Sequence, residues 1–309
     1  MKTLYRGKIF TFNQSANLQN LQGVIPDALF VNDERFTFLR DGAIIVENGK
    51  ISAVGDYNEI SSLLSSEDKT VDYRGKLITP GFIDTHIHAT QTSSVSAYGE
   101  KLLTWLDNYV FPSEVAFNSE QSGRREYDIL LKQLFKNGTT SICAYLPTSY
   151  DGADLIFEMT DKYNMRVIMG NTIMTDGNAK LITNPQTSMK ISEKLYNKWH
   201  GVNRSSYALT PRFALSCTDE TLGLCREFME SHPDSYVQSH LCENINEIAD
   251  TVAKFSWAKD YLEVYEKSGL VNARSIYGHC IHLSESEWSR MVEKQAIFAN
   301  CPVSNNYLG

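Results

Sequence analysis

The sequence lacks several patterns that mark whole classes of protein. None of its six cysteines forms a C-x-x-C pair, no stretch of 18 apolar residues occurs, and the N-terminus MKTLYRGKIFTF has no apolar signal-peptide core. Positive charge is also short, with 29 Lys and Arg against 37 Asp and Glu. Scattered cysteines are typical of reduced thiols, a membrane helix needs about 20 apolar residues, and nucleic-acid binding needs a basic surface. We therefore expect a cytoplasmic protein with no membrane or nucleic-acid partner.

The acidic balance that remains, a net charge of −8, is ordinary for an enzyme acting on a small neutral molecule.

The first 75 residues contain short strand patterns. In Asp41–Gly55, two β-branched runs flank Asn48-Gly49, a pair that readily supplies the positive φ values of a tight hairpin turn. The stretch TVDYRGKLITPG adds another strand and turn. Residues 1–75 therefore predict a small, sandwich-like β-domain.

After residue 75 the pattern changes to short apolar runs that alternate with amphipathic helical segments. Gly138 follows one such helical segment and fits its C-cap, where a positive φ is needed. Alternation of strands and helices predicts parallel βαβ units, and so either a doubly wound sheet or a (β/α) barrel. The candidate strands are Leu77–Thr85, Thr139–Ala144, Arg166–Gly170, Tyr207–Arg212, Tyr236–His240, Ser275–His279 and Ala296–Cys301.

Four of the seven histidines lie at the ends of three candidate strands. His86 and His88 are two residues apart, so they point to the same face if their strand continues through them. His240 ends the fifth strand and His279 the sixth. Any one of them could be a satisfied core or surface histidine. Because the carboxyl ends of parallel strands meet at one face of a barrel, the set of four instead predicts a metal site there.

Glu243 comes three residues after His240, where the next helix is expected to open. One interpretation is a carboxylate stabilised by the positive end of the helix dipole. The other is a proton shuttle beside a metal, because zinc lowers the pKa of a bound water to about 7. Of the remaining histidines, His282 is expected to face solvent, and His200 and His232 look incidental.

Six stretches carry a resemblance to a known family. They are PGFIDTHIHATQ, LLTWLDNYVFPSE, FKNGTTSICAY, LTPRFALSC, QSHLCEN and YGHCIHLSE. Together they resemble the amidohydrolase superfamily and, within it, the guanine deaminase family, from about Leu77 to the end. The resemblance implies an incomplete TIM-like (β/α) barrel over residues 76–309. It also implies hydrolysis of guanine to xanthine and ammonia by a zinc-activated hydroxide, with one zinc ion per subunit, and a homodimer.

The resemblance assigns a role to each candidate site residue. Arg212 could read a purine carbonyl edge with its donor fork, although a surface salt bridge is the alternative. Phe213 could pack on the purine ring or be a core aromatic, and Gln91 could bind a base edge or be an ordinary loop residue. By position, the metal ligands are His86, His88, His240 and His279, the proton-transfer residue is Glu243, and the substrate contacts are Gln91, Arg212 and Phe213.

The sequence departs from the family pattern near its end. Seven strands are counted where a closed barrel needs eight, so the barrel is expected to be truncated after the seventh strand. No aspartate follows His279, whereas family members carry one at strand eight, and Asn300 and Val303 stand where the family has histidine and asparagine. The hypothesis is that this chain has little or no deaminase activity. Deamination of another heterocycle, or a non-catalytic binding role, are the alternatives.

Overall fold

In the computed structural model the chain divides into two units, Met1–Gly81 and Phe82–Gly309. The structure describes residues 1–12, 36–95, 97, 102–115, 117 and 120–307. Residues 13–35 of the expected β-domain, and the last two residues of the stretch after the seventh strand, therefore lie outside the described residues.

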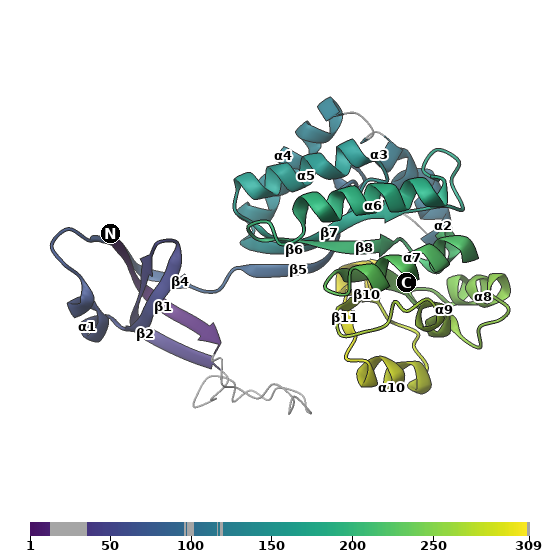
Figure 1. Ribbon diagram of the computed structural model, residues 1–309. Coiled ribbons are helices and arrows are strands. Elements are labelled where there is room, and N and C mark those ends of the chain that lie inside the picture. Colours follow the sequence, from purple (N-terminus) through teal and green to yellow (C-terminus); the bar gives the residue numbers. More distant parts are fainter. Residues whose placement is uncertain (13–35, 96, 98–101, 116, 118–119, 308–309) are drawn as a thin grey trace. The chain divides into compact units, whose positions relative to one another are not determined.

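The N-terminal unit is a four-stranded sheet in the order β3-β2-β1-β4 (Figure 1). The predicted hairpin is confirmed: Glu47 pairs with Lys50, and Asn48 and Gly49 between them have φ values of 51° and 73°. A small core of Leu4, Ala43 and Ile45 is packed beneath a short helix. The elements are β1 (Lys2–Phe12), β2 (Phe36–Glu47), β3 (Lys50–Asp56), α1 (Tyr57–Ile60) and β4 (Lys69–Ile78).

The second unit is built on seven parallel strands in the order β11-β10-β9-β8-β7-β6-β5, which we call the barrel sheet. Each strand is paired with its neighbours in sequence order, as expected when every crossover is a right-handed βαβ unit. The predicted TIM-like barrel fold is thus confirmed. The strands are β5 (Phe82–His88), β6 (Thr139–Leu146), β7 (Arg166–Ile173), β8 (Ser205–Pro211), β9 (Tyr236–Leu241), β10 (Ser275–His279) and β11 (Ile297–Ala299).

One predicted boundary was wrong. Leu77 and Ile78 do not begin the first barrel strand; they end β4 and pair with Lys8 and Ile9 of β1. The chain leaves that sheet at Pro80, which has no backbone N–H to donate to a ladder. The barrel strand β5 starts only at Phe82.

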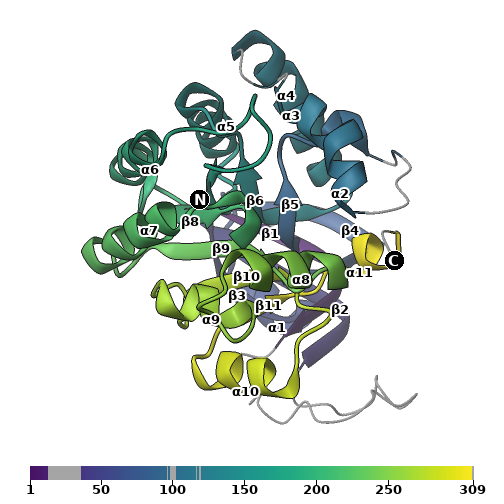
Figure 2. The same cartoon turned by 90° about the vertical axis from the view of Figure 1, so that its right-hand side faces the viewer.

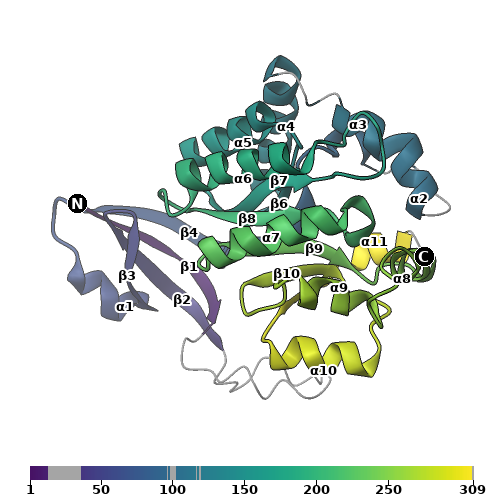
Figure 3. The same cartoon turned by 45° about the vertical axis from the view of Figure 1, so that its right-hand side comes forward.

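Helices cover the outside of the barrel sheet, with α4, α5 and α6 side by side (Figure 1) and α7 next to β8 and β9 (Figures 2 and 3). The predicted C-cap is confirmed, because α4 ends at Lys136 and Gly138 has a φ of 82°. The helices are α2 (Leu102–Trp105), α3 (Phe111–Val115), α4 (Glu120–Lys136), α5 (Tyr150–Lys162), α6 (Pro185–Trp199), α7 (Asp219–Ser231), α8 (Ile245–Lys254), α9 (Tyr261–Lys267), α10 (Glu285–Glu293) and α11 (Pro302–Tyr307).

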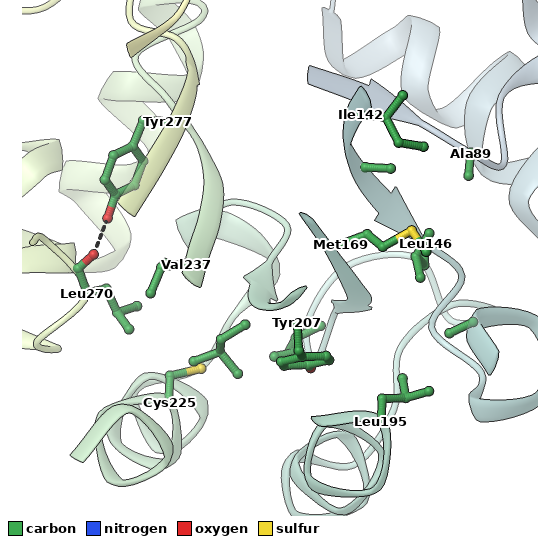
Figure 4. Packing of buried hydrophobic residues seen from close by; sticks show 14 of the residues in the cluster. Ala89, Ile142, Leu146, Met169, Leu195, Tyr207, Cys225, Val237, Leu270 and Tyr277 are labelled. Atoms are coloured by element: carbon green, nitrogen blue, oxygen red, sulfur yellow. Dashed lines mark hydrogen bonds between the residues drawn. The ribbon is translucent and has the colours of Figure 1, made fainter. Parts of the chain in front are cut away.

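The main core fills the space between the barrel sheet and these helices. Figure 4 shows Tyr207 of β8 among side chains from the two helices that cover it, Leu195 of α6 and Cys225 of α7. Tyr207 is fully buried, and its hydroxyl donates to Oδ1 of Asn171 at 2.8 Å. Full burial of a large apolar side chain such as that of Leu195 stabilises the fold by about 1.5–3 kcal/mol. Among the described residues, no helix is long and apolar enough to cross a membrane.

The close approach of β7 and β8 depends on the absence of a side chain at Gly170. A Cβ on Gly170 would lie 1.8 Å from the backbone oxygen of Ala208. Since backbone cannot move aside cheaply, we expect Gly170→Ala to lower the free energy of unfolding by about 3 kcal/mol or more. Urea denaturation measures this. The matched control is Gly223→Ala in α7, where a Cβ meets nothing within 4 Å, so its stability should be unchanged or raised. Equal midpoints for the two variants would contradict the prediction.

Candidate active site

Four histidine rings meet at the carboxyl ends of three barrel strands. Ring nitrogens of His86, His240 and His279 all lie within 4.8 Å of one another. The Nε2 atom of His88 is 3.0 Å from Nε2 of His240. The ring centroid of His86 lies 5.4 Å from that of His88, 4.7 Å from that of His240 and 5.0 Å from that of His279. The structure therefore brings together all four histidines that the sequence singled out.

The strand ends are shaped to let these rings approach. A Cβ on Gly278 would lie only 2.4 Å from Cε1 of His86, so glycine is needed for the imidazole to pack on β10. The next residue, His279, has a φ of 70°, which a non-glycine residue rarely adopts and which often occurs at functional sites. The backbone thus turns just where His279 has to face the other rings.

Hydrogen bonds orient two of the rings. Nδ1 of His240 lies 2.5 Å from the backbone oxygen of Arg212, and Nδ1 of His279 lies 2.9 Å from Oδ1 of Asn305 in α11. Because both partners are acceptors, each Nδ1 carries the proton and each Nε2 keeps a lone pair. Partners of this kind orient metal-ligating histidines. No sequence pattern pointed to Asn305.

Burial also keeps the rings uncharged. It lowers the pKa of His86 to about 3 and lowers the pKa of His88 and His240 well below the usual value, and the positive charge of Arg212 and the neighbouring imidazoles lower these pKa values further. Neutral imidazole is the form that binds metals. The donor set of this cluster therefore fits a divalent metal ion with nitrogen ligands. Tyr145 of β6, which sequence reasoning missed, stacks on His88 with ring centroids 4.5 Å apart.

Glu243 lies beside the histidine cluster, with Oε2 3.4 Å from Nε2 of His279. It precedes the N-cap of α8, Asn244, rather than opening the helix as predicted. The carboxylate of Glu247 accepts from the backbone N–H groups of Glu243 and Asn244 and fixes this turn. Burial raises the pKa of Glu243 to about 8. A carboxyl group with such a pKa can hold and release a proton near neutral pH.

The polar residues predicted to contact a substrate are joined by a carboxylate that the sequence did not single out. Arg212 is 3% exposed, and its Nη1 lies 2.6 Å from Oε2 of Glu114. The amide Nε2 of Gln91 donates to Oε1 of the same Glu114 at 3.2 Å. Arg212 therefore makes a buried ion pair, not a surface one. The only signal for Glu114 was its place at the end of the LLTWLDNYVFPSE stretch.

Phe213 and the three histidines outside the cluster have different surroundings. Phe213 comes directly after Arg212 and is half-buried, and its backbone N–H donates to Oγ of Ser216. His282 is exposed, as expected. His200 and His232 contact the carboxylates of Asp234 and Glu193, respectively, rather than joining the four-histidine cluster.

Comparison with known proteins agrees with this architecture. The model of the amidohydrolase family matches residues 77–309. The chain is 38% identical to guanine deaminase of Escherichia coli over 88% of its own length, and 33% identical to a probable guanine deaminase of Deinococcus radiodurans over 92%. It spans 62% and 64% of the lengths of these two relatives.

The fold of this chain is also similar to solved structures of guanine deaminases. The structure of E. coli guanine deaminase superposes with a TM-score of 0.93 at 34% identity, covering 99% of this chain and 69% of that chain. The structure of guanine deaminase from C. acetobutylicum with bound guanine in the active site superposes with a TM-score of 0.87 at 28% identity, covering 100% of this chain and 70% of that chain.

A parallel barrel that carries histidines and a buried carboxyl group at its strand ends has the architecture of a protein whose site could hold a metal ion. Together with the match over residues 77–309, it shows that the chain belongs to the amidohydrolase family.

The contact between Gly278 and His86 yields a prediction about the histidine cluster. Gly278→Ala would place a Cβ 2.4 Å from Cε1 of His86 and push that ring out of the cluster. We expect the affinity for a divalent metal ion, probed with Zn²⁺, to fall by about tenfold or more, the size of effect seen when ligand orientation is lost. Competition with a chromogenic chelator measures it, with Gly223→Ala as the control. Unchanged zinc affinity in the folded Gly278→Ala variant would contradict this reading of the site.

Proposed function

We propose that this chain carries the active site of a guanine deaminase, which hydrolyses guanine to xanthine and ammonia. The observation that carries the proposal is the convergence of three elements at one end of the barrel: the four histidines, Glu243 beside His279, and the Glu114–Arg212 pair next to Gln91. The relatives from E. coli and D. radiodurans support it by name, and the C. acetobutylicum structure supports it by the guanine bound in its active site.

We propose zinc as the metal, one ion per chain, because neutral imidazoles are ligands that zinc prefers. His86, His88, His240 and His279 would hold it. When bound, it would lower the pKa of a water molecule and supply hydroxide at neutral pH.

The chain's own residues would bind the base and move protons. Arg212 would donate to the carbonyl oxygen of guanine, Gln91 would bind a base edge that both donates and accepts, and Phe213 would pack on the ring. Glu243 would give its proton to a ring nitrogen, take a proton from the hydroxyl group that has added to the carbon, and pass that proton to the departing amine, so that ammonia leaves as a neutral molecule. The pKa of Glu243, raised to about 8 by burial, suits this work.

We propose a cytoplasmic location, two domains and a homodimer for this chain. All six cysteines are free thiols, which supports a reducing compartment such as the cytoplasm. We propose that the two parts of the chain, which the sequence divides at residue 75 and the structure divides at Gly81, act as a β-domain and a barrel domain, and that two copies form a homodimer.

Zinc binding can be tested without activity. After treatment with a chelator, the chain should take up one equivalent of Zn²⁺, measured by elemental analysis, and its melting temperature should rise, because a ligand present at 100 times its Kd stabilises by about 2.7 kcal/mol. His240→Ala should lose both effects. His282→Ala is the control, because His282 is exposed and should leave both unchanged. Equal zinc uptake by His240→Ala would overturn the ligand assignment.

The reaction is tested by following xanthine formation from guanine with zinc-loaded protein. We expect Glu243→Gln, which keeps the shape but cannot carry a proton in the same way, to lower kcat by about 10² or more. Glu285→Gln, an exposed residue of α10, is the control and should leave kcat unchanged. Faster turnover of adenine or cytosine than of guanine would instead indicate another amidohydrolase activity. Zinc and guanine binding without turnover would indicate a non-catalytic role.

A further inference from the structure

The carboxylate of Glu114 lies at the centre of a buried polar bridge. Glu114 is 6% exposed, and each of its two oxygens has its own partner: Oε2 accepts from Arg212 at 2.6 Å and Oε1 accepts from Gln91 at 3.2 Å. We propose that Glu114 is a positioning residue that sets the hydrogen-bond pattern with which Arg212 and Gln91 recognise a purine carbonyl edge. This inference rests on the proposed function.

Glu114 first fixes the orientation of the guanidinium group. The Nη1 atom of Arg212 donates to Glu114, with the sulfur of Met174 3.9 Å away, and the guanidinium carbon lies 5.1 Å from the centroid of the Phe111 ring. Among the described residues, Nε and Nη2 of Arg212 make no hydrogen bond. A guanidinium group has five donors in a fixed plane. Because the group is planar and Nη1 is bound to Glu114, the N–H groups of Nε and Nη2 have a fixed orientation and remain available to a ligand.

Glu114 also decides which end of the Gln91 amide points away from it. An ionised carboxylate only accepts hydrogen bonds, so it binds the NH₂ end of the amide and excludes the oxygen end. The amide oxygen of Gln91 is then left to accept from an N–H group of a base. Without Glu114, the amide could rotate by 180° and present the opposite pattern.

The charge of Glu114 balances that of Arg212. An unpaired guanidinium in a buried site would favour an anionic ligand, whereas the ion pair leaves the site without net charge from these two groups. A neutral base that offers one carbonyl oxygen and neighbouring N–H donors fits this pattern. The geometry therefore favours an oxopurine over a purine that lacks the carbonyl group.

Glu114 is held in place by a segment outside the barrel sheet. The helix α2 continues through a π-helical turn, Leu106–Val110, into α3, which carries Glu114. A cluster of apolar side chains anchors this segment against Met174 and Leu181, which follow β7. The hydroxyl of Ser113 donates to the backbone oxygen of Thr90, one residue before Gln91. The same segment thus fixes both the carboxylate and the loop that carries Gln91.

The test uses two ligands that have no amino group to lose. Hypoxanthine carries the carbonyl group that Arg212 would bind, and purine lacks it. Dissociation constants are measured by calorimetry on the zinc-loaded full chain and on Glu114→Gln. In that variant, the introduced amide can still accept from Arg212 through its oxygen, but it would turn its NH₂ group toward Gln91 and force the Gln91 amide to rotate. We expect the Kd of hypoxanthine to rise by about tenfold or more, and that of purine to change less than threefold.

Two further variants separate positioning from a general loss of structure. Glu114→Asp keeps the charge but is one methylene shorter, so it should keep the Arg212 pair, lose the Gln91 bond and show an intermediate Kd for hypoxanthine. Glu287→Gln is the matched control, because Glu287 is 5% exposed and caps α10 through Ser284. It should lower the melting temperature and leave both dissociation constants unchanged. If Glu114→Gln does not fold by circular dichroism, Glu114→Asp decides.

The outcomes distinguish this inference from the function on which it rests. If the unmodified chain binds neither guanine nor hypoxanthine, the proposed function itself is overturned. If the unmodified chain binds both and the Glu114 variants bind hypoxanthine with unchanged affinity, only the role of Glu114 is overturned. Equal weakening of hypoxanthine and purine binding would also overturn it, because that is the result of a purely structural role.

Discussion

The site depends on one constraint: four imidazole rings lie side by side, two of them buried and two partly buried, so a positive charge on any of them is strongly disfavoured. Burial and mutual repulsion lower the pKa of His86, His88 and His240. A neutral ring still needs an acceptor for its one N–H group, and for His240 and His279 these acceptors are the backbone oxygen of Arg212 and the side chain of Asn305. The tautomers, and hence the direction of the ligand lone pairs, follow from where those acceptors lie.

Glu243 and Glu247 lie close together around the N-terminus of α8, but their carboxyl groups have different hydrogen-bond partners. Burial raises the pKa of both Glu243 and Glu247. Glu247 accepts from two backbone N–H groups and from the hydroxyl of Tyr261 at 2.8 Å, and these bonds oppose the effect of burial on its pKa. Glu243 has no such donor among the described residues, because Nε2 of His279, which faces its carboxyl group, keeps a lone pair. The carboxyl group of Glu243 therefore keeps its proton more readily. The carboxylate of Glu247 thus fixes the turn that carries Glu243, the proposed proton-transfer residue.

Much of this architecture was predictable from the sequence, because it depends on local patterns. Alternating apolar runs indicated all seven barrel strands, Asn48-Gly49 indicated the hairpin, and the strand-end positions indicated the four histidines. What the sequence could not reveal depends on contacts between distant segments. Glu114 reaches Arg212 across 98 positions and Asn305 reaches His279 across 26. The boundary at Leu77 was missed because the same apolar residues fit either of two strands, and only Pro80 and the pairing with β1 decide between them.

Arg212 links the two halves of the site through two different parts of the same residue. Its backbone oxygen orients His240, and its guanidinium group is held by Glu114. Replacing the side chain leaves the carbonyl oxygen in place, so the orientation of His240 does not depend on the guanidinium group. A displacement of the backbone at the end of β8, in contrast, would move the histidine and the guanidinium group together. The register of β8 against β9, in which Leu209 pairs with Val237, therefore sets the spacing between the imidazole of His240 and the guanidinium group of Arg212 more firmly than any single side chain does.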